Sequence, residues 1–268
     1  MTEKIAVVEA NNDALPGASI DPMEQIIAVH LGFEDGDVAS RIRRSKTMKA
    51  PATQRSFAPA VPRVSLSEFQ SLDPTGVSEM IARRTSHRDY VDRPMTMGEL
   101  AFILRGAVGT KAYRSNAYNV SSYPVSSAPS AGGLQPLNIY VYVSQVKGLE
   151  SGVYYYAPNE DELVELWLGR PDLDLARIFM TDFSPRAPVS IAVTGDIDRF
   201  AWKYGYRGYR LLNVDCGVAA AYLGLVAESI GIGTCAVAAF SATAVSASLD
   251  LKSHELPLLC ISMGPKRG

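Results

Sequence analysis

The stretch Arg207–Phe240, RGYRLLNVDCGVAAAYLGLVAESIGIGTCAVAAF, decides the fold class. Its first part, 207–230, lacks proline and is mostly apolar, and Gly231 follows it as a suitable residue after a helix end. We expect one long and mostly buried helix there. Cys235–Phe240 is a short apolar run, so a strand is predicted directly after the helix.

Outward from this helix, short runs of β-favouring residues predict further strands, and two helices are predicted earlier in the chain. Thr96 and Glu99 have the spacing of a capping box, which predicts a helix through Ala107. Because helices and strands do not alternate one for one, the pattern favours an α+β fold over a doubly wound parallel sheet. The remaining predicted segments are a helix at Val77–Ile81 and strands at Ile139–Val143, Val153–Tyr156, Val189–Thr194 and Leu256–Met263.

Charge and proline divide the chain near residue 75. Acidic residues dominate 1–40, basic residues crowd 41–49, and prolines at 51, 59 and 62 interrupt any helix. We therefore expect an N-terminal extension over 1–75 and one main domain over 76–268. The charged blocks are interpreted as a solvated arm or as a docking surface for a partner or an acidic substrate. Residues 113–131 are rich in serine and lack a sustained period, which predicts a long loop.

Composition excludes several classes of protein. With 268 residues, 47% hydrophobic and 20% charged, the chain is neither disordered nor a coiled coil. A net charge of −2 gives no overall field for nucleic acid or an anionic membrane. The sequence shows neither a signal peptide nor an apolar span long enough to cross a membrane, so we expect a soluble, cytoplasmic protein. Three isolated cysteines and three scattered histidines make a metal site improbable.

Three short motifs carry candidate chemistry. In Arg84-Thr-Ser-His-Arg88, an extended chain would place Arg84, Ser86 and Arg88 on one side, where forked donors suit a phosphate or the polar edge of a heterocycle. The alternative is a basic helix end. In Pro129-Ser-Ala-Gly-Gly-Leu-Gln-Pro136, small residues would let backbone amides approach a flat ligand, and the alternative is a tight loop into a strand.

The third motif is Lys203-Tyr-Gly-Tyr-Arg-Gly-Tyr-Arg210. On one helix, Lys203, Arg207 and Arg210 would form a single cationic stripe with tyrosines between them. A solvated face is the alternative interpretation. Because tyrosine and glycine are dense here and a buried helix follows, we favour a functional role.

Taken in order, the three motifs resemble those of the nitroreductase-like flavoproteins, and within them those of the SagB-type dehydrogenases. The resemblance covers about residues 55–264. It implies a mixed, mainly antiparallel sheet covered by helices, and a homodimer with FMN at the dimer interface. It also implies oxidation of thiazoline or oxazoline rings in a ribosomally made peptide to thiazoles or oxazoles, beside a cyclodehydratase.

The resemblance further implies roles for individual residues. Lys203 and Tyr204 match a catalytic pair. Gly133 stands where related enzymes often have asparagine, and Ala238-Ala239 replace a glycine-containing turn beside the flavin. The implied FMN-binding residues are Arg84, Ser86 and Arg88 for the phosphate and ring edge, Pro129, Ser130, Gly132 and Gln135 along the isoalloxazine, and Arg267 as an additional phosphate ligand.

Aromatising an azoline removes a proton and a hydride, and a flavin is required for the hydride because no side chain stores two electrons reversibly. We expect burial and the neighbouring Arg207 and Arg210 to keep the Lys203 amine neutral, so that it can act as a base with Tyr204. Dioxygen is the expected electron acceptor, and residues 1–50 are the candidate docking segment for the cyclodehydratase.

Two other functions stay open at this point. One is an NAD(P)H-dependent nitro- or quinone reductase on the same fold. The other is a non-catalytic scaffold subunit of a peptide-modifying complex, for which Gly133 and Ala238-Ala239 are the supporting departures.

Overall fold

A computed structural model describes residues 52–69, 76–169, 174–205 and 207–267, all within the unit Asp35–Gly268. A seven-stranded sheet of order β1-β8-β7-β5-β9-β11-β10 lies at its centre, and each neighbouring pair in it is antiparallel. The predicted α+β class is therefore confirmed. The strands of this sheet are β1 (Arg63–Ser65), β5 (Leu137–Val143), β7 (Gly152–Ala157), β8 (Glu162–Leu168), β9 (Val189–Asp196), β10 (Ile232–Val237) and β11 (Glu255–Pro265).

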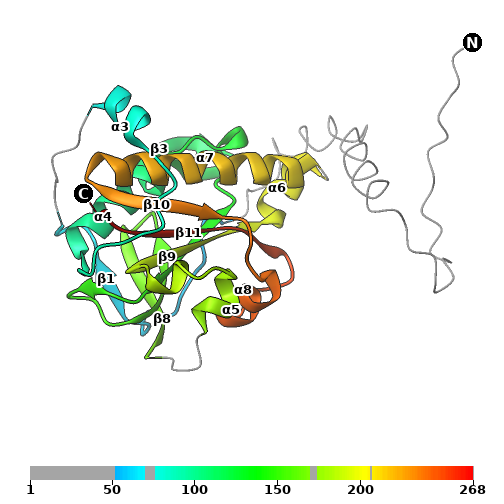
Figure 1. Ribbon diagram of the computed structural model, residues 1–268. Coiled ribbons are helices and arrows are strands. Elements are labelled where there is room, and N and C mark those ends of the chain that lie inside the picture. Colours follow the sequence, from blue (N-terminus) through cyan, green and yellow to red (C-terminus); the bar gives the residue numbers. More distant parts are fainter. Residues whose placement is uncertain (1–51, 70–75, 170–173, 206, 268) are drawn as a thin grey trace, which may run out of the picture. The chain divides into compact units, whose positions relative to one another are not determined.

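Helices cover both faces of this sheet (Figure 1). One face packs against α4 (Met97–Val108) and α7 (Arg207–Ser229), and the other against α5 (Leu175–Phe179) and α8 (Ala242–Leu249). Side chains of β5 alternate between the two cores, with Val141 on the α7 side and Tyr140 on the α8 side. The further elements are α3 (Val77–Arg83), α6 (Ile197–Tyr204), short turns at Ala131–Gly133 and Ser184–Arg186, and the paired strands β2 (Met95–Thr96) and β6 (Val146–Lys147).

The two strongest helix predictions are confirmed. Thr96 and Glu99 form a complete capping box at the start of α4, with Glu99 N donating to Thr96 Oγ1 at 3.1 Å. The predicted long helix is α7, which is long and apolar enough by composition to cross a membrane. It packs against α4, α6 and β10 instead, as the core helix of a globular domain does.

The predicted loop over 113–131 is wrong. Most of this region belongs to a hairpin of β3 (Thr110–Ala117) and β4 (Val120–Ser126), paired antiparallel outside the main sheet. Most of β3 is exposed, so neither strand shows the apolar alternation by which a half-buried strand is recognised. Proline cannot donate a backbone hydrogen bond, but Pro124 is tolerated in β4 because both strands of a two-stranded ribbon have a free edge.

The segment expected as an N-terminal extension contributes to the sheet. Val64 of β1 pairs with Leu163 of β8, and Leu66 after it is fully buried. Because β1 has only three residues and follows the prolines at 59 and 62, the sequence shows no alternating pattern that would predict this strand. The charged blocks over 1–49 lie outside the described residues.

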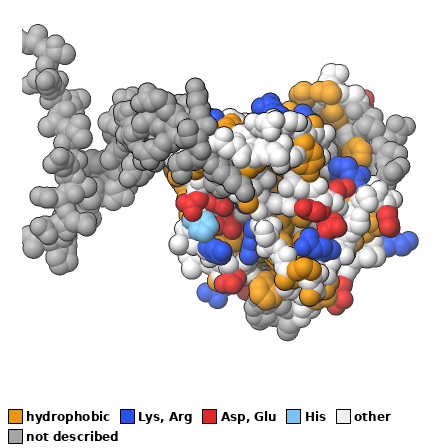
Figure 2. All heavy atoms as spheres, turned by 180° about the vertical axis from the view of Figure 1, so that it is seen from behind, with side chains coloured by type: hydrophobic (Ala, Val, Ile, Leu, Met, Phe, Trp, Pro, Cys, Tyr) orange, Lys and Arg blue, Asp and Glu red, His pale blue; other side chains and the backbone are white. Residues whose placement is uncertain are grey.

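Charges of both signs are interspersed on the face of the described domain in Figure 2, and neither sign dominates it. This distribution agrees with the near-balanced sequence charge of −2.

Candidate active site

The turn Pro129–Gln135 lies directly before β5, where the sequence placed it. Gly132 and Gly133 have φ of 62° and 69°, and Gln135 has φ of 50°. These are left-handed conformations, which cost little for glycine and more for glutamine. The Ser130 hydroxyl accepts from the backbone amide of Gln135 at 3.1 Å and closes the turn.

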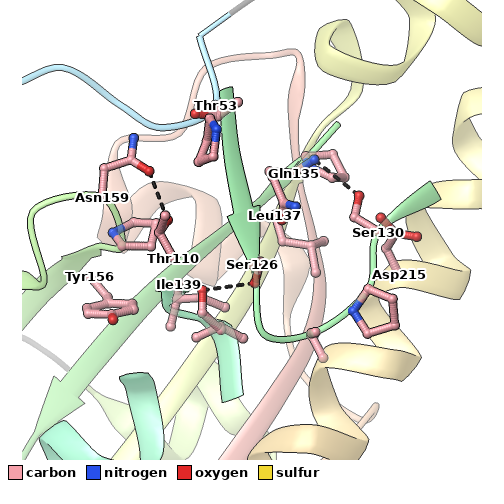
Figure 3. A pocket seen from close by; sticks show the side chains of 17 residues that line it. Thr53, Thr110, Ser126, Ser130, Gln135, Leu137, Ile139, Tyr156, Asn159 and Asp215 are labelled. Atoms are coloured by element: carbon pink, nitrogen blue, oxygen red, sulfur yellow. Dashed lines mark hydrogen bonds between the residues drawn. The ribbon is translucent and has the colours of Figure 1, made fainter. Parts of the chain in front are cut away.

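Two buried charged residues hold this turn from different helices. Asp215 on α7 is 4% exposed and accepts from the amide of Ala131 at 3.0 Å. In Figure 3 the Ser130 side chain lies between Gln135 and Asp215. Burial raises the pKa of Asp215, and hydrogen bonds from Ser130 and Ala131 offset only part of this effect. On α6, Arg199 is 3% exposed and donates to the Gln135 carbonyl at 3.1 Å.

Lys203 and Tyr204, the predicted catalytic pair, lie at the end of α6 and meet the turn at Gly132. A Cβ atom added to Gly132 would lie 2.5 Å from the Tyr204 hydroxyl and 3.0 Å from Lys203 Nζ. Any side chain here would displace the ends of both groups from these positions. The structure thus brings the second and third sequence motifs together.

Tyr118, at the tip of the β3–β4 hairpin, completes this group and was missed by the sequence analysis. Lys203 Nζ donates to the Tyr118 hydroxyl at 3.0 Å, and that hydroxyl donates to the Gly132 carbonyl. The Tyr118 ring also packs edge-on against Trp202. A tyrosine inside a serine-rich region predicted as loop gave no signal of this position.

The predicted neutral amine at position 203 is wrong. Burial lowers the pKa of Lys203, but the hydroxyls of Tyr118 and Tyr204 outweigh it, so that the net shift is upward. The expected cationic stripe is also absent, because α6 ends at Tyr204 and α7 begins at Arg207. Lys203 is therefore a charged donor held by two tyrosines.

A pocket of about 290 Å³ opens beside the turn. This volume is close to the ~300–1,000 Å³ typical of ligand sites. A Cβ atom on Gly133 would meet nothing within 4 Å, so the backbone there faces open space where a flat ring can approach. The lining residues include Ser130, Gly132, Gly133 and Gln135 of the turn, Tyr118, Lys111 and Arg114 of the hairpin, and Tyr222 of α7. A narrower cleft of about 40 Å³ adjoins it and is lined by Pro129, Ser130, Gln135 and Asp215 among others (Figure 3).

The first motif lies elsewhere, along β10 at one edge of the sheet. Ser86 pairs with Thr234, and Arg84, Ser86 and Arg88 are all exposed. Arg88 donates to the Ser86 carbonyl at 3.2 Å. Arg267 contacts the same segment, because its Nη1 atom lies 3.3 Å from Asp89 Oδ2.

Two further features bear on the predicted site. Ala238 and Ala239 are exposed directly after β10, as the sequence placed them. The turn before β5 is separated from this edge by β9 and β11. Within one chain the predicted cofactor residues therefore form two groups, one at the turn before β5 and one along β10.

A possible metal-binding cluster also occurs among the residues that the structure describes, although the sequence predicted none. Ligand atoms of Asp196, Asp198 and His254 lie within 4.8 Å of one another. Asp196 already caps α6 and pairs with Arg199 at 3.2 Å. This carboxylate therefore has a structural role without any ion.

The model of the nitroreductase family matches residues 81–265, which include all of the site residues named above apart from Arg267. The chain belongs to the nitroreductase family. Family membership identifies the protein as an oxidoreductase, and nitroreductase-family proteins typically bind flavin and are generally soluble.

A Methanocaldococcus jannaschii protein described as a nitroreductase is 31% identical over 200 residues, covering 74% of this chain and 96% of that protein. A nitroreductase-like structure from Anabaena variabilis superposes with a TM-score of 0.61 and 23% identity over 78% of this chain. The match spans only 42% of the Anabaena chain.

A chain of the E. coli microcin synthetase McbBCD complex, solved with truncated pro-MccB17 bound, has a TM-score of 0.59 and 19% identity. That match covers 91% of this chain and 98% of the other. At these identities both structural matches establish the nitroreductase fold alone.

Proposed function

We propose that this nitroreductase-family protein is a SagB-type, FMN-dependent azoline dehydrogenase that converts thiazoline or oxazoline rings of a ribosomally synthesised peptide to thiazoles or oxazoles. One observation carries the proposal: the Lys203–Tyr204 pair meets the glycine turn at Gly132. A near-full-length likeness to a chain from a microcin synthetase complex that holds a pro-peptide supports the substrate class.

The residues present fit FMN. Gly133 opens the backbone of the turn to a pocket of about 290 Å³, against which a flat ring can lie. Arg84, Ser86, Arg88 and Arg267 provide hydroxyl and guanidinium donors suited to its phosphate. When bound, FMN would supply the hydride acceptor that the side chains lack, and dioxygen is our proposed final acceptor.

The side chains would manage the proton. Aromatisation breaks two C–H bonds, one as a hydride and one as a proton, and forms a ring double bond. As the proton leaves, negative charge develops on the azoline, and the Lys203 ammonium can stabilise it. The Tyr204 hydroxyl, held against the turn, would take up this proton while it passes its own proton to water in the open pocket, which is the final proton acceptor.

A second copy of the chain would complete the site. The phosphate-binding group lies along β10, and the turn lies before β5, so each copy would offer one group to the partner's cofactor. Apolar side chains are exposed on α7 and α3, where Val214 is 54% and Val77 is 64% accessible. A homodimer would cover these side chains. The protein would act in the cytoplasm with a cyclodehydratase that makes the azolines.

Lys203→Ala tests this function. We expect the purified variant to keep its flavin absorbance and to lose azole formation by ~10²–10³-fold. Mass spectrometry of an azoline peptide measures the reaction as the loss of two hydrogens per ring. Lys147→Ala, an exposed lysine on β6, is the matched control. Undiminished turnover in Lys203→Ala would remove this residue from the mechanism.

A nitro- or quinone reductase is the second candidate, favoured by the Methanocaldococcus jannaschii relative that is described as a nitroreductase. Rapid anaerobic bleaching of the flavin by NADPH, with no azole formation, would support it. A colourless protein would instead favour the scaffold subunit.

A further inference from the structure

The geometry points to Tyr118 as a positioning residue for Lys203: the hairpin tip places its hydroxyl between the Lys203 ammonium and the Gly132 carbonyl, and so fixes the ammonium over the turn. This inference rests on the proposed function for its chemistry, but its geometric part does not require a particular substrate.

Two hydrogen bonds in series define the arrangement. Lys203 Nζ donates to the Tyr118 hydroxyl at 3.0 Å, and the hydroxyl donates to the Gly132 carbonyl. A tyrosine hydroxyl accepts and donates at once, so both bonds form together. Without that hydroxyl, the ammonium loses its link to the turn backbone.

The Tyr118 ring holds the same ammonium from a second direction. Lys203 Nζ lies 4.8 Å from the centroid of the Tyr118 ring and 5.0 Å from that of Tyr204. Both distances are within the range of a cation–π contact. The ring is fixed in turn by edge-on packing against Tyr123 and Trp202, with centroid distances of 5.0 and 5.6 Å.

The backbone at the hairpin tip is unusual in the same place. Asn116, Tyr118 and Asn119 have φ of 53°, 53° and 59°. Asparagine adopts this left-handed conformation readily, but a bulky aromatic residue rarely does. Ala117 pairs with Val120, so Tyr118 and Asn119 form a two-residue hairpin loop, which needs positive φ at both positions. The loop thus holds the backbone of Tyr118 in one conformation, and the contacts to Lys203, Gly132 and the two rings hold its side chain.

Tyr118→Phe tests the inference because it removes the hydroxyl and keeps the ring. The first readout is the rate at which a lysine-directed acylating reagent modifies Lys203, followed by peptide mass spectrometry across pH. The groups that raise the pKa of this amine are the hydroxyls of Tyr118 on the hairpin and Tyr204 on α6. We therefore expect Tyr118→Phe to react about tenfold faster at a given pH, with its profile displaced to lower pH.

Tyr113→Phe is the matched control, since it makes the same change on the same hairpin. Tyr113 is 54% exposed, and its hydroxyl donates to the Asn159 carbonyl at 3.3 Å. We expect it to leave Lys203 acylation unchanged. Thermal unfolding of both variants establishes that they are folded, and Tyr118→Leu provides a second loss of the hydroxyl.

The second readout is azole formation, for which we expect kcat to fall about tenfold with KM and flavin absorbance unchanged. Equal acylation of Lys203 in Tyr118→Phe and in the unsubstituted protein would overturn the inference, whatever the reaction. If acylation responds as expected but no azole forms even in the unsubstituted protein, the positioning role stands and the proposed function fails.

Discussion

Replacing Gly132 by alanine provides a test of the central contact, and Gly133→Ala is its internal reference. Both residues have left-handed backbones, with φ of 62° and 69°. Each alanine therefore carries a similar conformational cost of roughly 1–2 kcal/mol. The two positions differ in what the new methyl group would meet.

At Gly132 the added carbon would lie 2.5 Å from the Tyr204 hydroxyl and 3.0 Å from Lys203 Nζ, whereas at Gly133 it would meet nothing within 4 Å. Both atoms are the free ends of flexible side chains, so the two side chains can move aside and the strain of a packed core does not arise. Their displacement removes the bond from Lys203 to Tyr118, which is worth about 1 kcal/mol. We expect Gly132→Ala to be less stable than Gly133→Ala by about that amount. With about 2–4 °C per kcal/mol in a chain of this size, the difference is measurable by thermal unfolding.

Urea titration of both variants gives the same comparison at constant temperature. Equal stability of the two variants would contradict the packing of Lys203 and Tyr204 against the turn, and with it the site as described.

Three other predictions concern titratable groups. The pKa of Glu99 is held low, because hydrogen bonds from Arg93 and Thr96 outweigh the effect of its desolvation. Glu99→Ala should therefore lower the free energy of unfolding by ~1–2 kcal/mol at pH 7. The loss should shrink as the pH falls through that pKa, as measured by urea unfolding. The raised pKa of Asp215 shows that the folded protein disfavours its ionised form. Asp215→Asn should therefore gain stability relative to the unsubstituted chain as the pH rises above about 4. Unfolding midpoints of both proteins, measured over a series of pH values, test the direction of this change. Lys203 also has a raised pKa, but it is charged in its protonated form, so its contribution to stability is present at neutral pH and lost at alkaline pH. The difference in unfolding free energy between Lys203→Met and the unsubstituted chain should therefore shrink towards high pH.

The sequence predicted those parts of the fold that have a strong local signal. The Thr96–Glu99 box and the long helix at 207–229 follow from spacing and from the absence of proline, and the structure has both. The hairpin at 110–126 could not be predicted in this way, because its strands are mostly exposed and do not alternate. The contribution of β1 was equally hidden, because a three-residue strand carries no period.

The sequence singled out the turn and the Lys203–Tyr204 pair, which the structure places in contact, but it gave no signal for the groups that hold them. Asp215 lies in the middle of an apolar helix and Arg199 on another, and only the folded arrangement shows that both bind the turn. The charge of Lys203 was predicted from its neighbours in sequence. In the structure it depends instead on Tyr118, which is distant along the chain and close in space.

The Arg199 guanidinium also joins the start of the described chain to the turn before β5. The same nitrogen, Nη1, donates to the Thr53 carbonyl at 2.9 Å and to the Gln135 carbonyl at 3.1 Å. A truncated protein beginning at residue 58 would leave that nitrogen with one acceptor and would also lose the bond from Arg55 to Tyr140. Proteins shortened from this end would therefore hold the turn before β5 less firmly, and residues from Thr53 onward belong in any protein prepared for assay.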